Sequence, residues 1–295
     1  MIMPLHFQLP TENQTQLAVA VFPAPNARGI VQIIHGALEH KERYYEFADY
    51  LSEHGYIAVL SDNRGHGRSI SPADPRGVMR SLPQIIADQV RVTRFAKARY
   101  PDLPVSLFGH SFGSILARLY LQAHDDEIVS VALTGTANYN PIVPVGLFLG
   151  KAFLRFHDET AKSPLLSKIS GLTPSDHSWL SYNQENIRRA SEDALMMAEY
   201  PVRSLETLWQ ADYQLHQIDR FQFKNPNLAI LSVVGVDDKF SGGEKGLADT
   251  VATLRKIGYR NVTSEQVPGM KHEVLRETGR ERVFARLVAF FDTYQ

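Results

Sequence analysis

The pentapeptide Gly109-His110-Ser111-Phe112-Gly113 lies between a short apolar run, Val105 to Phe108, and a segment with helical spacing of apolar residues, Ser114 to Leu121. A Gly-x-Ser-x-Gly pattern in this setting is typical of a tight turn from a buried strand into a helix, with the serine hydroxyl at its apex. Such a turn strains the backbone and brings neighbouring segments close, and residues without a Cβ allow both. The sequence therefore predicts a nucleophile elbow with Ser111 as the nucleophile.

A serine of this kind acts with an acid and a histidine, which follow it in that order on loops after later strands. An apolar run from Asn227 to Gly235 leads to two adjacent acids, Asp237 and Asp238. Only one of the eleven histidines, His272, comes after them. We predict that His272 accepts the proton of Ser111 and that Asp238, the fourth residue counted from Gly235, orients the imidazole. Asp237 remains the alternative acid.

Acyl transfer also needs hydrogen-bond donors that face the developing oxyanion. One donor is the backbone N–H after the nucleophile, which belongs to Phe112. The second is expected from an earlier loop, where the buried strand pattern Gly29 to Ile34 continues into His35-Gly36-Ala37. We predict that the N–H groups of Ala37 and Phe112 form the oxyanion hole.

Three segments resemble the monoacylglycerol lipase and lysophospholipase branch of the serine α/β-hydrolases, which is of the serine aminopeptidase S33 type. They are His35-Gly36-Ala37-Leu38-Glu39-His40 with Arg43-Tyr44, Asp62-Asn63-Arg64-Gly65-His66-Gly67-Arg68-Ser69, and Met270-Lys271-His272-Glu273-Val274-Leu275-Arg276-Glu277. The resemblance implies a serine hydrolase that cleaves carboxylic esters through an acyl-enzyme on Ser111. It also implies monoacylglycerols or lysophospholipids as substrates.

The chain departs from the pattern of this branch in two places. Phe112 and Ser114 stand where the branch usually has methionine and glycine. Lys239-Phe240 follows Asp238, where the branch usually has proline after the acid. The second departure leaves the choice between Asp237 and Asp238 open.

Apolar runs of strand length alternate with helical stretches along most of the chain, the order that a mostly parallel sheet flanked by helices requires. The strand-like runs are Leu17 to Phe22, Ile30 to Ile34, Ile57 to Leu60, Val105 to Phe108, Ile128 to Leu133, Ala229 to Val234 and Val262 to Val267. The helical stretches are Tyr44 to Glu53, Ile85 to Arg99, Ser114 to His124, Glu244 to Lys256 and Arg280 to Thr293. The sequence therefore predicts an α/β protein with the α/β-hydrolase fold.

The alternation stops between about Tyr139 and Phe221, where helical spacing continues but no buried strand pattern occurs. We predict that residues 137–221 form a helical cap, or lid, inserted into a core domain made of residues 1–136 and 222–295. Inserts of this kind shape the substrate pocket.

The first part of the predicted cap, Ile142 to Leu149, is unusually apolar and precedes Lys151 and Arg155. It would line an acyl-chain tunnel, with Leu147 and Phe148 as candidate substrate-binding residues, or touch a lipid surface transiently. Ordinary packing within the cap is the alternative, since an apolar helix is more often buried against its own domain.

The resemblance implies a small-molecule ester or lipid-like substrate as the partner, and the composition excludes other partners. With 31 basic and 32 acidic residues the formal charge is −1, so neither nucleic acid nor an anionic membrane is expected to bind. No apolar run reaches the length of a membrane span, and the N-terminus lacks the pattern of a signal peptide, so we expect a cytoplasmic enzyme without stable membrane insertion. The chain contains no cysteine and no metal-binding or dinucleotide pattern, so we expect no metal and no cofactor.

Two other functions stay open on sequence grounds. The same triad serves aminopeptidases and other hydrolases of amide or carbon–carbon bonds. An aminopeptidase would need carboxylates in the cap to hold the substrate amine, and the candidates there are Glu185, Glu192, Asp193 and Glu199. A non-catalytic ligand binder is the least favoured alternative, because no triad member is missing.

Overall fold

Eight strands form one mixed sheet in the computed structural model of the chain, which describes residues 2–12, 15–173 and 177–294. In chain order they are β1 (Leu5–Pro10), β2 (Gln16–Phe22), β3 (Gly29–Ile34), β4 (Tyr56–Ser61), β5 (Val105–His110), β6 (Ser130–Thr134), β7 (Ala229–Gly235) and β8 (Asn261–Val267). In space the order is β1-β2-β4-β3-β5-β6-β7-β8. The β1–β2 and β2–β4 pairs are antiparallel, and the other neighbouring pairs are parallel.

The parallel strands end together at one edge of the sheet. In the register, Ile34 at the end of β3 lies opposite Gly109, and Gly235 at the end of β7 lies opposite Val267. In open parallel sheets, ligands bind beyond the carboxyl ends of the strands. The loops at this edge hold the predicted site residues Ala37, Ser111, Asp238 and His272.

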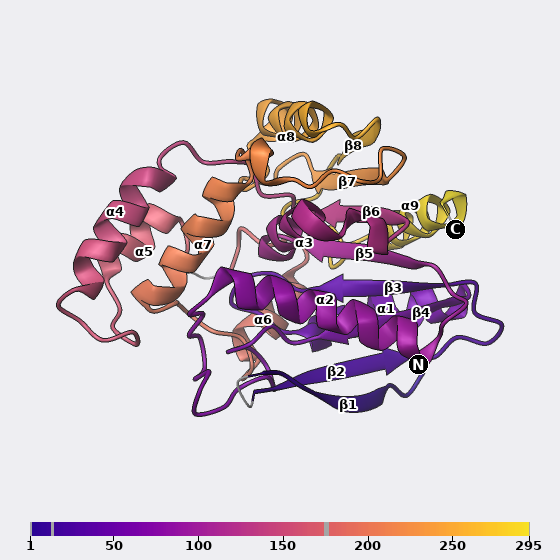
Figure 1. The fold of residues 1–295 in the computed structure, drawn as a ribbon, viewed down its shortest axis with the longest axis horizontal. Helices are drawn as coiled ribbons and strands as arrows, with labels where there is room; N and C mark the ends of the chain where they lie inside the picture. Colours follow the sequence, from indigo (N-terminus) through magenta and orange to yellow (C-terminus); the bar gives the residue numbers. More distant parts are fainter. Residues whose placement is uncertain (1, 13–14, 174–176, 295) are drawn as a thin grey trace.

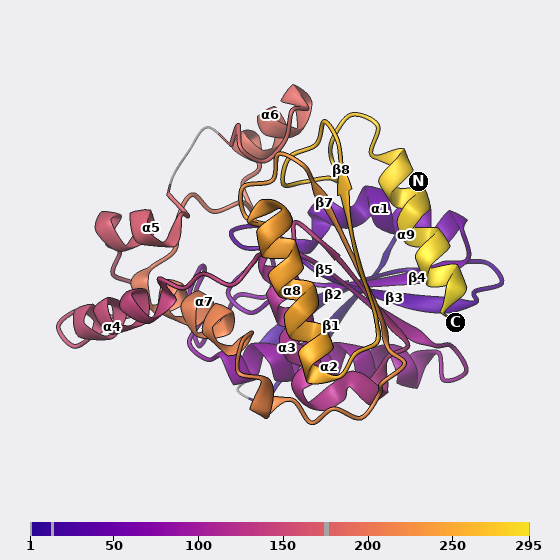
Figure 2. The ribbon, with the colours of Figure 1, turned by 90° about the horizontal axis from the view of Figure 1, so that it is seen from above.

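Helices cover both faces of the sheet, which explains why β3 to β7 are buried along their whole length. On one face, α1 (Tyr45–Glu53) and α9 (Glu281–Thr293) lie side by side (Figure 2). On the other face pack α2 (Leu82–Arg99), α3 (Phe112–His124) and α8 (Gly243–Ile257). The predicted fold, a mostly parallel sheet flanked by helices, is confirmed.

Between β6 and β7, the described residues form four α-helices: α4 (Val143–Leu154), α5 (Pro164–Ser170), α6 (Gln184–Glu192) and α7 (Val202–Gln214). We call residues 137–221 the inserted segment. Figure 1 shows α4, α5 and α7 beyond the carboxyl edge, on the side toward which the arrowheads of β3 and β5 point. The division of the chain into a core and a cap domain stays a prediction.

One strand and one helix start differ clearly from the sequence prediction. β1 is absent from the predicted strands because it is a short edge strand with alternating, partly exposed residues. α2 begins at Leu82, three residues before the predicted start at Ile85, because the Ser81 side chain caps the helix by accepting the N–H of Gln84. Within residues 2–12, 15–173 and 177–294, none of the helices combines the length and the apolar character that crossing a bilayer requires.

Candidate active site

Ser111 lies in a strained turn between β5 and α3. Its φ of 53° falls in the left-handed region, which residues with a side chain rarely adopt. The glycines on either side are explained by close approach: a Cβ on Gly113 would collide with the carbonyl oxygen of Ile34, and one on Gly109 with the carbonyl oxygen of Gly113. The N–H of Ser111 donates to the Thr134 carbonyl at 3.0 Å, which holds the turn against β6.

Asp238 rather than Asp237 is the partner of His272. The Nδ1–H of His272 donates to Oδ1 of Asp238 at 2.9 Å, and both side chains are buried. The backbone N–H of Phe240 donates to the same oxygen at 2.9 Å and fixes the carboxylate. Asp237 is exposed, and its backbone N–H donates to the carbonyl of Met270.

The electrostatics of this pair favour a charged imidazole. Burial lowers the pKa of His272, but the charge of Asp238 and the hydrogen bond to it outweigh burial, so the pKa lies above its ordinary value. Burial raises the pKa of Asp238, but the charge of His272 and the hydrogen bonds from His272 and Phe240 hold it below its usual range. Asp238 is therefore a carboxylate that stabilises the imidazolium form of His272.

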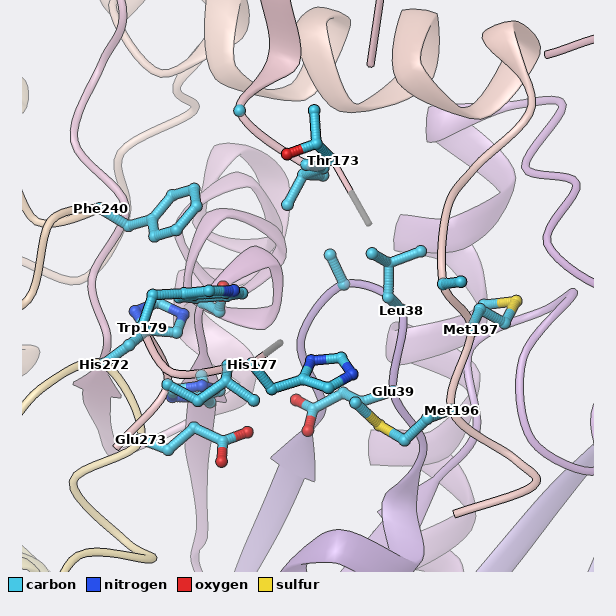
Figure 3. Close-up of a pocket in the computed structure, with 17 residues that line it drawn as sticks. Leu38, Glu39, Thr173, His177, Trp179, Met196, Met197, Phe240, His272 and Glu273 are labelled. Carbon is cyan, nitrogen blue, oxygen red and sulfur yellow. The ribbon is translucent and has the colours of Figure 1, made fainter. Parts of the chain in front are cut away.

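Ser111 and His272 line the same cavity, of about 90 Å³, which we call the His272 cavity (Figure 3). In the part of the chain that the structure describes, no hydrogen bond joins the Ser111 hydroxyl to the imidazole. Such bonds are often long without substrate and tighten in the complex. The ring centroid of His110 lies 4.8 Å from that of His272. Burial, together with the charge of His272, lowers the pKa of His110 to about 4.

A second cavity, of about 470 Å³, meets the first at Ser111, and we call it the α7 cavity. Ala37, Ser111 and Phe112 all line it. The two residues whose backbone N–H groups were predicted to bind the oxyanion therefore lie beside the predicted nucleophile. Their role as donors stays a prediction.

Two aromatic side chains cover His272, and the sequence did not single them out for this position. The ring centroids of Trp179 and Phe240 each lie 5.1 Å from that of His272, and 4.8 Å from one another. Figure 3 shows both beside the imidazole. Phe240 lies two residues after Asp238, in the Lys239-Phe240 dipeptide that stands where related enzymes usually have proline. This unusual dipeptide was the one sequence signal that could have pointed to Phe240.

A buried ion network supports the loops around the site. Nη2 of Arg43 donates to both carboxylate oxygens of Glu273 at 2.7 Å, and Nε donates to Glu39 at 3.1 Å. The Tyr44 hydroxyl donates to Glu39, and Asn186 of α6 donates to Glu273. Burial raises the pKa of Glu273, but the charges of Arg43 and other basic groups dominate and lower it to about 2. The network joins the loops that carry Ala37 and His272 to the inserted segment.

Some predicted residues lie away from both cavities. Leu147 and Phe148 line neither of them, and the Phe148 side chain is 71% exposed. Val143, at the start of α4, lines the α7 cavity instead. The four acids considered for an aminopeptidase are also outside the cavities, and each is paired with a basic side chain: Glu185, Glu192, Asp193 and Glu199. Among the described residues, no group of three or more His, Asp or Glu side chains could hold a metal ion.

A strained serine after a central parallel strand, with a histidine and an acid on the loops after the last two strands, defines the α/β-hydrolase class. The chain is a hydrolytic enzyme of this class. The family model described as serine aminopeptidase, S33, matches residues 25–279, and the chain belongs to this family.

Relatives of known type support the same class. The chain is 26% identical over 269 residues to phospholipase YtpA of Bacillus subtilis, a match that covers 90% of this chain and 95% of that protein. It is 31% identical over 135 residues to a monoacylglycerol lipase of Mycolicibacterium smegmatis, which covers 44% of this chain and 47% of that protein. The crystal structure of a thermostable carboxyl esterase from Bacillus coagulans superimposes with a TM-score of 0.88 at 21% identity, over 100% of this chain and 99% of the esterase.

Proposed function

We propose that this enzyme hydrolyses carboxylic esters of the monoacylglycerol or lysophospholipid type through an acyl-enzyme on Ser111. The observation that carries the proposal is that Ser111, at the apex of its turn, shares a cavity with His272, whose Nδ1 is bonded to Asp238. The names of two relatives, a phospholipase and a monoacylglycerol lipase, support the substrate type.

The proposed reaction follows from these positions. Nε2 of His272 takes the proton of Ser111 as Oγ attacks the ester carbonyl, and Asp238 stabilises the imidazolium that forms. The oxyanion accepts hydrogen bonds from the N–H groups of Ala37 and Phe112. The bond to the alcohol breaks when His272 returns the proton to the leaving oxygen. Water then attacks the acyl-enzyme by the same route, and the carboxylic acid leaves.

We also propose that the inserted segment acts as a cap that meets lipid surfaces transiently. Large apolar side chains are exposed on and near α4 and α5, namely Ile142, Val145, Phe148, Phe156 and Leu165. Exposed apolar side chains gathered on one part of a protein favour contact with another apolar surface. Lys151 and Arg155, which are exposed on the same helix or next to it, suit the polar side of such a contact.

An aminopeptidase has less support from the site. It would need a carboxylate able to bind the substrate ammonium group. The carboxylates that line the His272 cavity, Glu39 and Glu273, are both bonded to Arg43, so their charge is already compensated. Nothing in the site favours an amide over an ester.

The test is a comparison of the natural enzyme with Ser111→Ala on two substrate sets. Monoacylglycerols, lysophospholipids and p-nitrophenyl esters form one set, and aminoacyl anilides the other. We expect ester hydrolysis to fall by about 10³-fold or more in Ser111→Ala, since removal of a nucleophile leaves only residual catalysis. Labelling by a fluorophosphonate probe should disappear with it.

Ser191→Ala is the matched control, because this exposed serine of α6 lies outside both cavities. It should keep activity and labelling. Hydrolysis of anilides without hydrolysis of esters, or labelling that persists in Ser111→Ala, would contradict the proposal.

A further inference from the structure

Ser111 stands at the junction of two cavities of unequal size. The His272 cavity measures about 90 Å³ and the α7 cavity about 470 Å³. His272 lines only the first, and Phe112 lines only the second. Each cavity must therefore take a different part of an ester bound at Ser111.

The chemistry of the proposed reaction decides which part goes where. The attacked carbon carries Oγ of Ser111, the oxyanion, the alcohol oxygen and the acyl chain. The alcohol oxygen must lie next to His272, which protonates it. The oxyanion must lie next to the N–H groups of Ala37 and Phe112. The acyl chain is left to extend into the α7 cavity.

The far wall of the α7 cavity comes from the inserted segment. Ser111, Phe112 and Ile115 line it from the core, whereas Leu208 and Trp209 of α7 line it from the other side. Trp209 is 5% exposed and is the largest side chain of this wall. An acyl chain that leaves Ser111 through this cavity therefore runs toward Trp209.

Trp209 cannot retreat from the cavity, because α4 lies directly behind it. A Cβ on Gly146 would lie 2.8 Å from Cε2 of the indole, and one on Gly150 would lie 3.2 Å from Cζ3. The two glycines are four residues apart and so face the same side of α4. The indole is packed against the helix backbone itself, with no side chain between them.

We propose that Trp209, held in place by Gly146 and Gly150, sets the maximum acyl-chain length that this enzyme accepts. The inference rests on the proposed ester hydrolysis at Ser111. It assigns a specificity-determining role to a residue of α7 and a supporting role to two glycines of α4.

The test is a chain-length profile of kcat/KM on p-nitrophenyl esters from acetate to palmitate, kept below their aggregation concentrations. Trp209→Ala should raise kcat/KM for the longest esters relative to acetate by about tenfold, since a few methylene groups in an apolar pocket are worth this much or more. Gly146→Ala should do the opposite, because its Cβ pushes the indole toward Ser111. Acetate, the shortest acyl chain, is the reference to which kcat/KM for the longer esters is normalised in each variant.

Thr207→Ala is the matched control for lost packing, because Thr207 is buried on α7, lines neither cavity and, two residues before Trp209, faces another side of the helix. It should leave the profile unchanged. If Trp209→Ala does not fold, Trp209→Phe and Gly146→Ala still move the profile in opposite directions.

The failures of the two proposals can be told apart. If no ester is hydrolysed in a Ser111-dependent way, the proposed function is wrong. If hydrolysis depends on Ser111 but Trp209 and Gly146 variants keep the natural profile, or lose activity equally at every chain length, only the role of Trp209 is wrong.

Discussion

At the scale of single residues, the site depends on a choice between two adjacent acids. Asp238 is buried, and its Oδ1 accepts a hydrogen bond from Nδ1 of His272, whereas Asp237 is exposed. Sequence spacing favoured Asp238, counted from the glycine that ends β7, and the structure shows why the neighbour cannot replace it. The N–H of Asp237 donates to the Met270 carbonyl, and Nδ1 of His272 is already bonded to Asp238.

We expect Asp238→Asn to lower kcat/KM for the best ester by about 10³- to 10⁴-fold, because an amide neither holds the required tautomer nor stabilises the imidazolium. Asp237→Asn, the matched control one residue away, should stay within about threefold of the natural enzyme. Steady-state kinetics at pH 8 measures both. Equal losses in the two variants would show that the bond from His272 to Asp238 does not serve catalysis.

At the scale of elements, Glu277 joins the loop of His272 to the inserted segment. Its buried carboxylate accepts the Lys271 N–H at 2.9 Å, the Ser181 hydroxyl at 2.7 Å and the Tyr182 N–H at 2.9 Å. Lys271 directly precedes His272. One side chain therefore fixes both the backbone next to His272 and the segment that leads into α6.

Glu277→Ala should reduce the free energy of unfolding by about 3 kcal/mol, because several donors lose a charged acceptor in a partly buried place. Glu281→Ala is the control: it removes a carboxylate that is 66% exposed and should change the free energy of unfolding by less than about 0.5 kcal/mol. Urea unfolding of both variants gives the comparison. A loss below about 1 kcal/mol for Glu277→Ala would mean that water replaces its hydrogen bonds.

At the scale of the whole molecule, buried neutral histidines couple stability to pH. Burial, helped by the charge of His35, lowers the pKa of His66 to about 3, and burial with the charge of His272 lowers that of His110 to about 4. His66 donates from Nδ1 to the Arg64 carbonyl and accepts the Tyr200 hydroxyl at Nε2, so it is bonded as a neutral ring. Burial also lowers the pKa of His35.

The unfolded chain binds protons to these histidines more readily than the folded chain does, so stability is lost as pH falls from about 6.5 toward 4. His272, with its raised pKa, acts in the opposite sense: its contribution is present at low pH and is lost as pH rises through its folded pKa. The lowered groups are more numerous, so acidification destabilises the fold.

We expect about 2 kcal/mol of stability to be lost between pH 6.5 and 4.5 for each of His66 and His110, at about 1.4 kcal/mol per pH unit and proton. Denaturant unfolding at several pH values measures the loss. His66→Gln should flatten this dependence, whereas His157→Gln, at an exposed position, should leave its slope unchanged. A slope that is the same in all three proteins would contradict the role of His66.

The sequence by itself determined the fold class, because the order of buried strands and amphipathic helices is a local signal. It also determined which serine and histidine come together, because chain order and the common carboxyl edge of parallel strands leave one solution. The sequence analysis did not predict β1, because a short, half-exposed edge strand has little local signal and is specified by its pairing with β2.

Only the tertiary structure decided what surrounds the proposed triad. The two cavities, the aromatic cover of Trp179 and Phe240, and the wall at Trp209 are made by segments far apart in the chain. Leu147 and Phe148 looked suitable because they are apolar, but apolar character does not tell which side of a helix faces a cavity. That side is set by packing, and on α4 it is Gly146 and Gly150 that let Trp209 come close.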